Sequence, residues 1–211
     1  MSIFRRCLPL TLLLLVTWSC GPLIDGGSRG TGITATVQGT VQTVQSSSEQ
    51  GSSGEGIRAS IKGHPAKSVT DSTGVFQVQG QFSGHLMVLF TRKSDGLRAT
   101  LSVYLPSAGI LTLNGVNIDT ASGTATPESA NVDFLGVMTE IDCTGQTLTM
   151  LSAKRPAGNM DPYTVDLSDS SITDSQGNPV PCSSLQSGQT AHVQGAVESD
   201  GSFGNASIVV Q

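Results

Sequence analysis

Cysteine is the residue type in this chain whose chemistry is easiest to interpret, and the sequence holds four of them. Cys7 and Cys20 lie near the N-terminus, whereas Cys143 and Cys182 lie in the second half. We expect no zinc site at the latter two, because no Cys-x-x-Cys pair or close histidine accompanies them. A disulfide between them would close a loop of roughly 40 residues and stabilise the fold by about 4 kcal/mol. Two reduced, buried cysteines are the alternative.

The N-terminal segment has the pattern of a secretory signal. Two arginines precede an apolar run, residues 8–16, and Ser19 supplies a small side chain directly before Cys20. The run is much shorter than the ~20 apolar residues that span a bilayer. Residues 1–19 are therefore predicted to be a signal peptide. Its removal discards Cys7, and export to an oxidising compartment favours the disulfide.

Cys20 at this cleavage point resembles the lipobox of bacterial lipoproteins, in which the cysteine is lipidated and becomes the mature N-terminus. Ser19 fits that pattern, whereas Thr17 and Trp18 stand where the family usually has leucine and a small residue. The resemblance implies anchoring by acyl chains to the bacterial cell envelope, at the outer membrane or the periplasmic face if the cell has two membranes. Gly-rich residues 20–32 would form a flexible tether reaching about 20 Å. An ordinary secretory signal with an incidental cysteine is the alternative.

No catalytic constellation is visible in the sequence, so we expect no enzyme. Residues 26–30 match G-x-S-x-G, but a nucleophile elbow needs a strand before it and a helix after it, and these residues lie in the tether. The three histidines fit neither H-E-x-x-H nor H-x-x-E. His64 precedes a proline and predicts a turn, whereas His85 and His192 are expected in or beside strands as surface or packed side chains.

An acidic stretch offers oxygen ligands, which suit calcium. It comprises Asp161, Asp166, Asp169 and Asp174, but the D-x-[DN]-x-[DN]-G spacing of a calcium loop is absent. Aspartate is also a favoured turn residue. We therefore favour turns over a metal site and expect no cofactor.

The charge of the chain is unevenly distributed. Residues 33–120 carry nearly balanced charges, whereas residues 131–211 carry only Lys154 and Arg155 against nine carboxylates. An acidic surface repels phosphate backbones, and aromatic residues that would stack on bases make up only 4% of the chain. We therefore expect no nucleic-acid partner.

Residues 33–119 are predicted to form one β-sandwich. Alternating apolar residues mark about seven short strands separated by turns. Residues 70–76 read T-D-S-T-G-V-F, a turn in which Asp71 accepts backbone hydrogen bonds, Gly74 takes positive φ and Phe76 enters the core. Residues 45–56, rich in serine, glycine and glutamate, are expected to be a mobile loop.

This module resembles the carboxypeptidase-regulatory-like domains, which are prealbumin-like sandwiches. The resemblance rests on the T-D-x-x-G-x-F turn, on Gly39-Thr40-Val41 upstream of it, and on residues 57–61 between the two. It covers most of residues 33–119 and implies an accessory module with no catalytic residues of its own.

A second module is predicted over residues 131–211, after an interdomain linker at residues 120–130 that is rich in serine and threonine. Residues 185–195 resemble the L-x-x-G-x-x-V-x-V-x-G segment of a bacterial family of unknown function. That family implies a small OB-like barrel in exported proteins. Asp200-Gly201 predicts a tight turn between the last two strands.

The sequence therefore predicts an all-β protein, with an N-terminal Ig/prealbumin-like β-sandwich followed by a small OB-like β-barrel. We expect a non-enzymatic, membrane-tethered envelope lipoprotein that acts as an interaction or structural module. Its partners would be the membrane, through the lipid on Cys20, and an envelope protein or glycan. A surface accessory protein that binds carbohydrate or a small ligand is the alternative.

Overall fold

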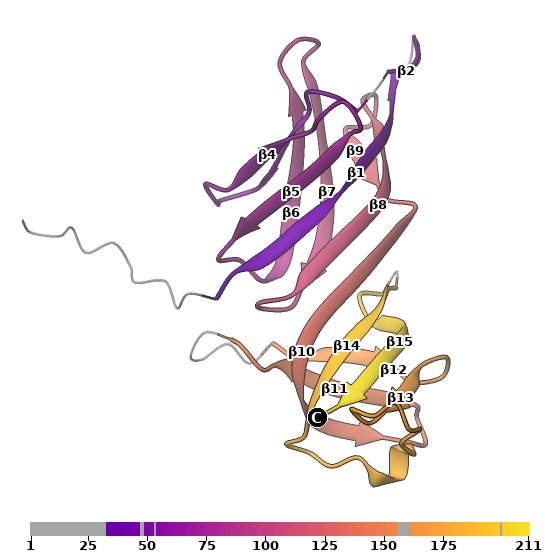
Figure 1. Cartoon of the computed structure of the whole chain (residues 1–211). Helices are drawn as coiled ribbons and strands as arrows, with labels where there is room; N and C mark the ends of the chain where they lie inside the picture. Colours follow the sequence, from indigo (N-terminus) through magenta and orange to yellow (C-terminus); the bar gives the residue numbers. More distant parts are fainter. Residues whose placement is uncertain (1–32, 47–48, 53, 156–160, 199) are drawn as a thin grey trace, which may run out of the picture.

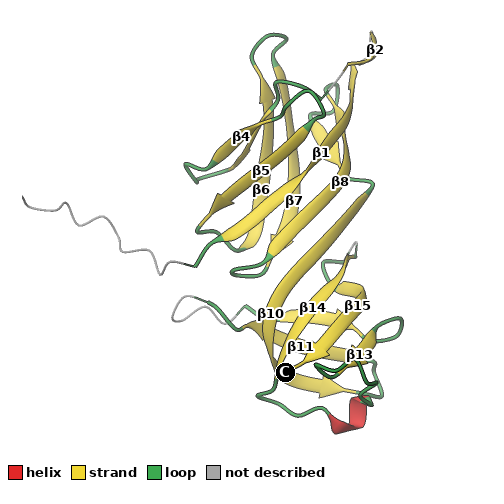
Figure 2. Ribbon diagram, in the orientation of Figure 1, coloured by secondary structure: helices red, strands yellow, loops and turns green. Residues whose placement is uncertain are grey.

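The computed structural model describes residues 33–46, 49–52, 54–155, 161–198 and 200–211. The expectations for the signal peptide, for Cys20 and for residues 20–32 lie outside these residues. The chain is all-β, as the sequence predicted, and its strands form a sandwich followed by a barrel (Figure 2).

The first sheet of the sandwich is built on β1 (Ala35–Ser46). Its neighbours are β5 (Val75–Gly80), which is antiparallel to it, and β8 (Ile110–Asp119), which is parallel to it. A short strand, β2 (Glu49–Ser52), pairs with the end of β1. The sequence predicted a mobile loop over residues 45–56, and the structure instead has strand pairing at residues 45–46 and 49–52 within it.

The second sheet runs in the order β4 (Lys67–Val69), β3 (Arg58–Ile61), β6 (Gly84–Arg92) and β7 (Leu97–Leu105). A three-residue strand, β9 (Thr124–Thr126), pairs with both β7 and β8 and so connects the two sheets.

The core of the sandwich lies between the two sheets, where alternate residues of each strand are buried. Phe76 of the first sheet meets Phe90 of the second edge to face, with 5.5 Å between ring centroids. Phe76 follows the turn that the sequence predicted. Asp71 Oδ1 accepts the N–H groups of Thr73 and Val75 at 2.9 and 3.0 Å, and Gly74 has φ of 78°.

The barrel consists of six strands: β10 (Ser129–Asp142), β11 (Thr147–Ser152), β12 (Tyr163–Asp166), β13 (Ser171–Thr173), β14 (Thr190–Val197) and β15 (Phe203–Val210). The pairing order β10-β11-β12-β15-β14 closes on itself, because β14 also pairs with β10. This five-stranded closure agrees with the predicted OB-like barrel. Asp200-Gly201 lies in the β14–β15 turn, where Gly201 has φ of 88°.

One disulfide joins Cys143, just after β10, to Cys182 in a single 3₁₀ turn (Cys182–Ser184). The two Cα atoms are 5.8 Å apart and 39 positions separate the residues. The bond holds the β10–β11 turn against the segment that leads into β14.

The strand β10 belongs to both units (Figure 1). Its start pairs with β8, from Ser129 to Asp133, and from Asn131 onwards it also pairs with β14. The prediction of a linker at residues 120–130 is wrong, because β9 and the start of β10 lie there. The backbone of this segment is hydrogen-bonded to β8, and so it continues the sheet instead of leaving it.

Alanine at Gly74 should test the packing of the Asp71 turn. A Cβ at this position would overlap the carbonyl oxygen of Val41, and φ is positive, so we expect Gly74→Ala to lower the free energy of unfolding by about 3 kcal/mol. Gly63 has a similar φ of 82° but no atom within 4 Å of such a Cβ, so Gly63→Ala should cost only about 1 kcal/mol. Urea unfolding followed by circular dichroism measures both, and equal losses would contradict the packing argument.

Candidate binding site

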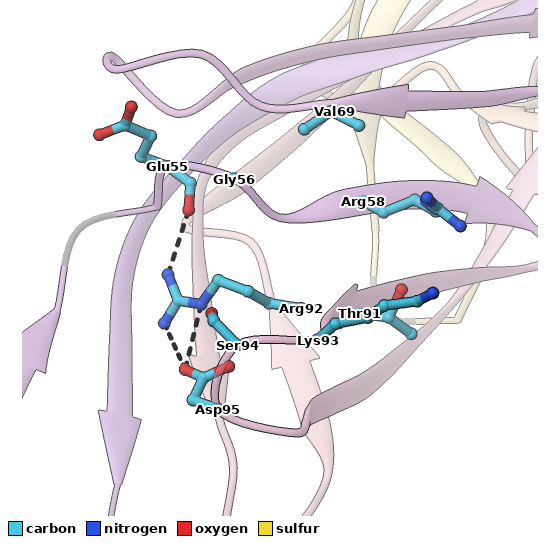
Figure 3. Close-up of a pocket in the computed structure, with 9 residues that line it drawn as sticks. All are labelled: Glu55, Gly56, Arg58, Val69, Thr91, Arg92, Lys93, Ser94 and Asp95. Atoms are coloured by element: carbon cyan, nitrogen blue, oxygen red, sulfur yellow. Dashed lines mark hydrogen bonds and ion pairs between the residues drawn. The ribbon is translucent and has the colours of Figure 1, made fainter.

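A hollow of about 620 Å³ opens at one end of the second sheet, between strands β3 and β4 and the β6–β7 turn (Figure 3). Its lining is polar and largely charged, with the exposed side chain of Val69 at one edge. The lining residues are Glu55, Gly56, Arg58, Val69, Thr91, Arg92, Lys93, Ser94 and Asp95.

Arg92 fixes the rim of this hollow. Its Nε and one terminal nitrogen donate to Asp95 Oδ2 at 3.0 and 2.7 Å, and its other terminal nitrogen donates to the carbonyl oxygen of Glu55 at 3.1 Å (Figure 3). The hydrogen bond from Arg92 lowers the pKa of the Asp95 carboxyl. The guanidinium therefore ties the β6–β7 turn to the loop that precedes β3.

Two further cations, Arg58 and Lys93, line the hollow, and strand register places Arg98 in the same row as Arg58. Thr91 pairs with Arg58 on one side and with Arg98 on the other. Paired residues of antiparallel strands point to the same face, so Arg58, Thr91 and Arg98 share the outer face of the sheet. Lys93, two residues beyond Thr91, lines the same hollow.

A second hollow, of about 830 Å³, lies on the other side of Thr91. It shares Thr91, Arg92 and Lys93 with the first and adds Arg98 to the lining. No carboxylate among the described residues forms an ion pair with Arg58, Lys93 or Arg98. Exposed guanidinium and ammonium groups without such partners suit the binding of an anionic group, which a guanidinium can hold through two parallel hydrogen bonds.

The residues singled out from the sequence lie elsewhere. His64 lies in the turn after β3, with its ring edge-on to Phe82 at 5.5 Å between centroids. His85 of β6 packs against Tyr104 of β7 at 4.5 Å. His192 of β14 is 2.6 Å from Asp133 Oδ1. No group of three metal-ligating side chains occurs within the described ranges.

Four aspartates of the barrel serve its turns, which is the role that the sequence favoured for Asp166 and Asp174. Asp174 Oδ1 accepts the N–H groups of Gln176 and Asn178 at 2.8 and 2.9 Å. Three others accept backbone N–H groups two residues along the chain: Asp142, Asp166 and Asp200. These four carboxylates accept hydrogen bonds within their own turns.

The basic cluster could not be recognised from charge counts. Six basic residues over residues 33–120 stand beside five acidic ones, so the segment reads as neutral. The signal that was available is local: Arg58 and Arg98 directly precede the alanines Ala59 and Ala99, which are buried. An alternating strand turns such neighbours to opposite faces, and antiparallel pairing then brings the two arginines together.

Comparisons with known proteins add little. No family model matches the chain, and no curated protein matches it either. A solved structure of a type II cohesin–X-dockerin complex from Acetivibrio cellulolyticus contains a similar chain, with 17% identity and a TM-score of 0.27. The match covers 46% of this chain and 58% of that chain, so this chain spans little more than half of its neighbour's length. A TM-score at this level carries no argument about function.

Acid should unfold this protein partly through its turn aspartates. Hydrogen bonds from Thr73 and Ser122 lower the pKa values of Asp71 and Asp119 below the ordinary 3.8. Each carboxylate therefore contributes stability above about pH 4, and that contribution is lost as the pH falls through the lowered pKa. We expect Asp71→Asn/Asp119→Asn to flatten the loss of stability between about pH 4 and pH 2.

The matched control for this experiment is Glu55→Gln/Glu140→Gln, which also removes two carboxylates. Urea unfolding at several pH values measures all three proteins. The control should keep the steep acid dependence of the unmodified chain. An equally flat curve for the control would contradict the role of the turns.

Proposed function

We propose that this chain is an exported, lipid-anchored module of the bacterial cell envelope that binds a partner and has no catalytic role. The observation that carries the proposal is the cationic rim shared by the two hollows at the β6–β7 turn. Exposed charged side chains held by a β-sheet are suited to binding another molecule.

The position of this site supports the proposal. Thr36, at the start of β1, donates to the carbonyl oxygen of Gly109 at 2.9 Å, and Gly109 lies against Asp133 of β10. The described chain therefore begins at the end of the sandwich that adjoins the barrel (Figure 1). The β6–β7 turn lies at the opposite end, about 26 Å along β6 from Gly84. The start of the described chain and the hollows therefore lie at opposite ends of the sandwich.

Export is supported by the disulfide between Cys143 and Cys182, a bond typical of oxidising compartments. In the part of the chain that the structure describes, no helix has the length and apolarity needed to cross a bilayer. Membrane attachment would then depend on acyl chains at Cys20. Stable anchoring of this kind takes more than one acyl chain or an added basic patch.

A surface accessory protein that binds carbohydrate or a small ligand is the second candidate function. The hollows favour it, because they combine charged groups with the hydroxyls of Thr91 and Ser94. Exposed aromatic rings, the usual platform for neutral sugars, are scarce: Tyr163 is buried and Tyr104 is half-buried.

Metabolic labelling with a fatty-acid analogue should decide whether the anchor exists. The wild-type chain should take up the label and sediment with membranes, whereas Cys20→Ala should do neither, because the acylated thiol is gone. The matched control is Cys143→Ala/Cys182→Ala, which removes two other cysteines and should keep the label. Label on Cys20→Ala, or its absence from the wild type, would refute the lipid anchor.

A further inference from the structure

We infer that the outer face of the second sheet binds an extended acidic polysaccharide. The basic face, as it is called below, carries five cations: Arg58, Lys62, Lys67, Lys93 and Arg98. The inference rests on the proposed role as a binding module and gives the chemical class of its ligand.

The charged residues of the sandwich are unevenly distributed between its two sheets. Strands β3, β4, β6 and β7 contain no aspartate or glutamate, and they carry Arg58, Lys67, Arg92 and Arg98. Lys62 and Lys93 directly follow β3 and β6. In the first sheet, by contrast, β1, β5 and β8 hold a single charged residue, Asp119. The outer face of β3, β4, β6 and β7 is therefore basic, with Glu55 and Asp95 at its edge and Asp95 paired with Arg92. The outer face of β1, β5 and β8, called the uncharged face below, has no charged side chain before Asp119.

Polar side chains on the uncharged face form hydrogen bonds with one another. Gln77 donates to Gln38 Oε1 at 3.2 Å, and Gln38 donates in turn to Thr112 Oγ1 at 3.2 Å. The side chains that cross this sheet therefore bond to one another. The cations of the basic face have no such partners in the described structure, which leaves them available to an anion.

Strand register spaces the cations at regular intervals. Arg58 and Arg98 are two strands apart in the same row, which places their backbones about 10 Å from each other. The next outward row begins with Lys67, opposite Ser60, and lies about 7 Å along the strands. Lys62 bonds through its N–H to Met87, one further row along. Cations at this spacing can contact several charged groups along a linear polyanion, whereas a compact anion would contact only one or two of them.

The residues between the cations suit a sugar chain. Hydroxyl side chains lie in the same outward rows as the cations, at Ser60, Thr91, Thr100 and Ser102. Arginine forks bind carboxylates through paired hydrogen bonds, and hydroxyls can both donate to and accept from sugar hydroxyls.

Other polyanions fit the basic face less well. Nucleic acid would need exposed rings on which bases stack, and the rings nearest the rows, His85 and Tyr104, pack on each other at 4.5 Å. A second copy of the chain would have to offer its acidic barrel, where four aspartates already accept hydrogen bonds within their own turns. A membrane would meet few exposed apolar side chains on this face: Val69 is 58% exposed, whereas Leu89 and Met87, which lie in the hydroxyl rows, are only partly exposed.

The test is binding of a fluorescent oligogalacturonate to the full-length protein, expressed with its own N-terminal segment and purified in mild detergent. We expect binding that weakens as salt is added. Arg58→Gln/Arg98→Gln should weaken it on the order of tenfold. The matched control is Gln77→Glu/Gln79→Glu, which changes the net charge by the same amount on the uncharged face and should bind within about twofold of the wild type.

Four results would overturn the inference. These are no binding, equal binding of a neutral glucan, equal losses in both double variants, and a preference for vesicles of anionic lipid over the oligogalacturonate. Concentration-dependent self-association that Arg58→Gln/Arg98→Gln abolishes would assign the face to a second copy instead. The fatty-acid labelling of Cys20 is independent of all these measurements, so failure of the ligand assignment and failure of the proposed anchor are distinguishable.

Discussion

The backbone pairing of β10 is the interaction on which the rest of this structure depends. This one strand, Ser129–Asp142, bonds to β8 of the sandwich at its start and to β14 and β11 of the barrel further along. Register in a strand is all-or-none, because a shift by one residue turns every side chain to the opposite face. A shift in β10 would therefore expose Phe134 and Met138, both buried in the barrel, and break the pairing with β8 at the same time.

The contacts around this shared strand make the junction a part of the core. Tyr104 of β7 lies 5.2 Å from Tyr163 of β12, and Tyr163 packs in turn against Phe134 at 5.6 Å between ring centroids. Ser152 of β11 donates to the carbonyl oxygen of Ser107 in the β7–β8 turn at 2.5 Å. Burial raises the pKa values of both tyrosines, which is what a junction poor in water would produce. The sandwich and the barrel are therefore held by apolar contact as well as by backbone bonds.

Local signals in the sequence were sufficient for most strands and turns. The T-D-x-x-G-x-F motif predicted the Asp71 turn because its roles depend on residues a few positions apart. Asp200-Gly201 predicted the turn before the last strand for the same reason, and Gly201 has φ of 88° there. The Cys143–Cys182 bond followed from counting cysteines, given an exported chain.

The features that could not be predicted are those that depend on long-range pairing. The serine- and threonine-rich residues 120–130 have the composition of a linker, and only the partner strand β8 makes them part of a sheet. The basic face also depends on the pairing of strands that are distant in sequence. Arg58 and Arg98 are far apart in sequence, and they meet in one row only because β3, β6 and β7 pair in that order.

A distance measurement between the two units tests the shared strand most directly. Spin labels at Ser94→Cys in the β6–β7 turn and Gln176→Cys in the barrel, both exposed positions, report how the units are held relative to each other. Labelling the full-length chain with Cys7 and Cys20 both replaced by alanine leaves the Cys143–Cys182 bond intact and no other free thiol. Double electron–electron resonance should give one narrow distance distribution. A broad or two-peaked distribution in the monomeric protein would show that the units move independently and would contradict the account.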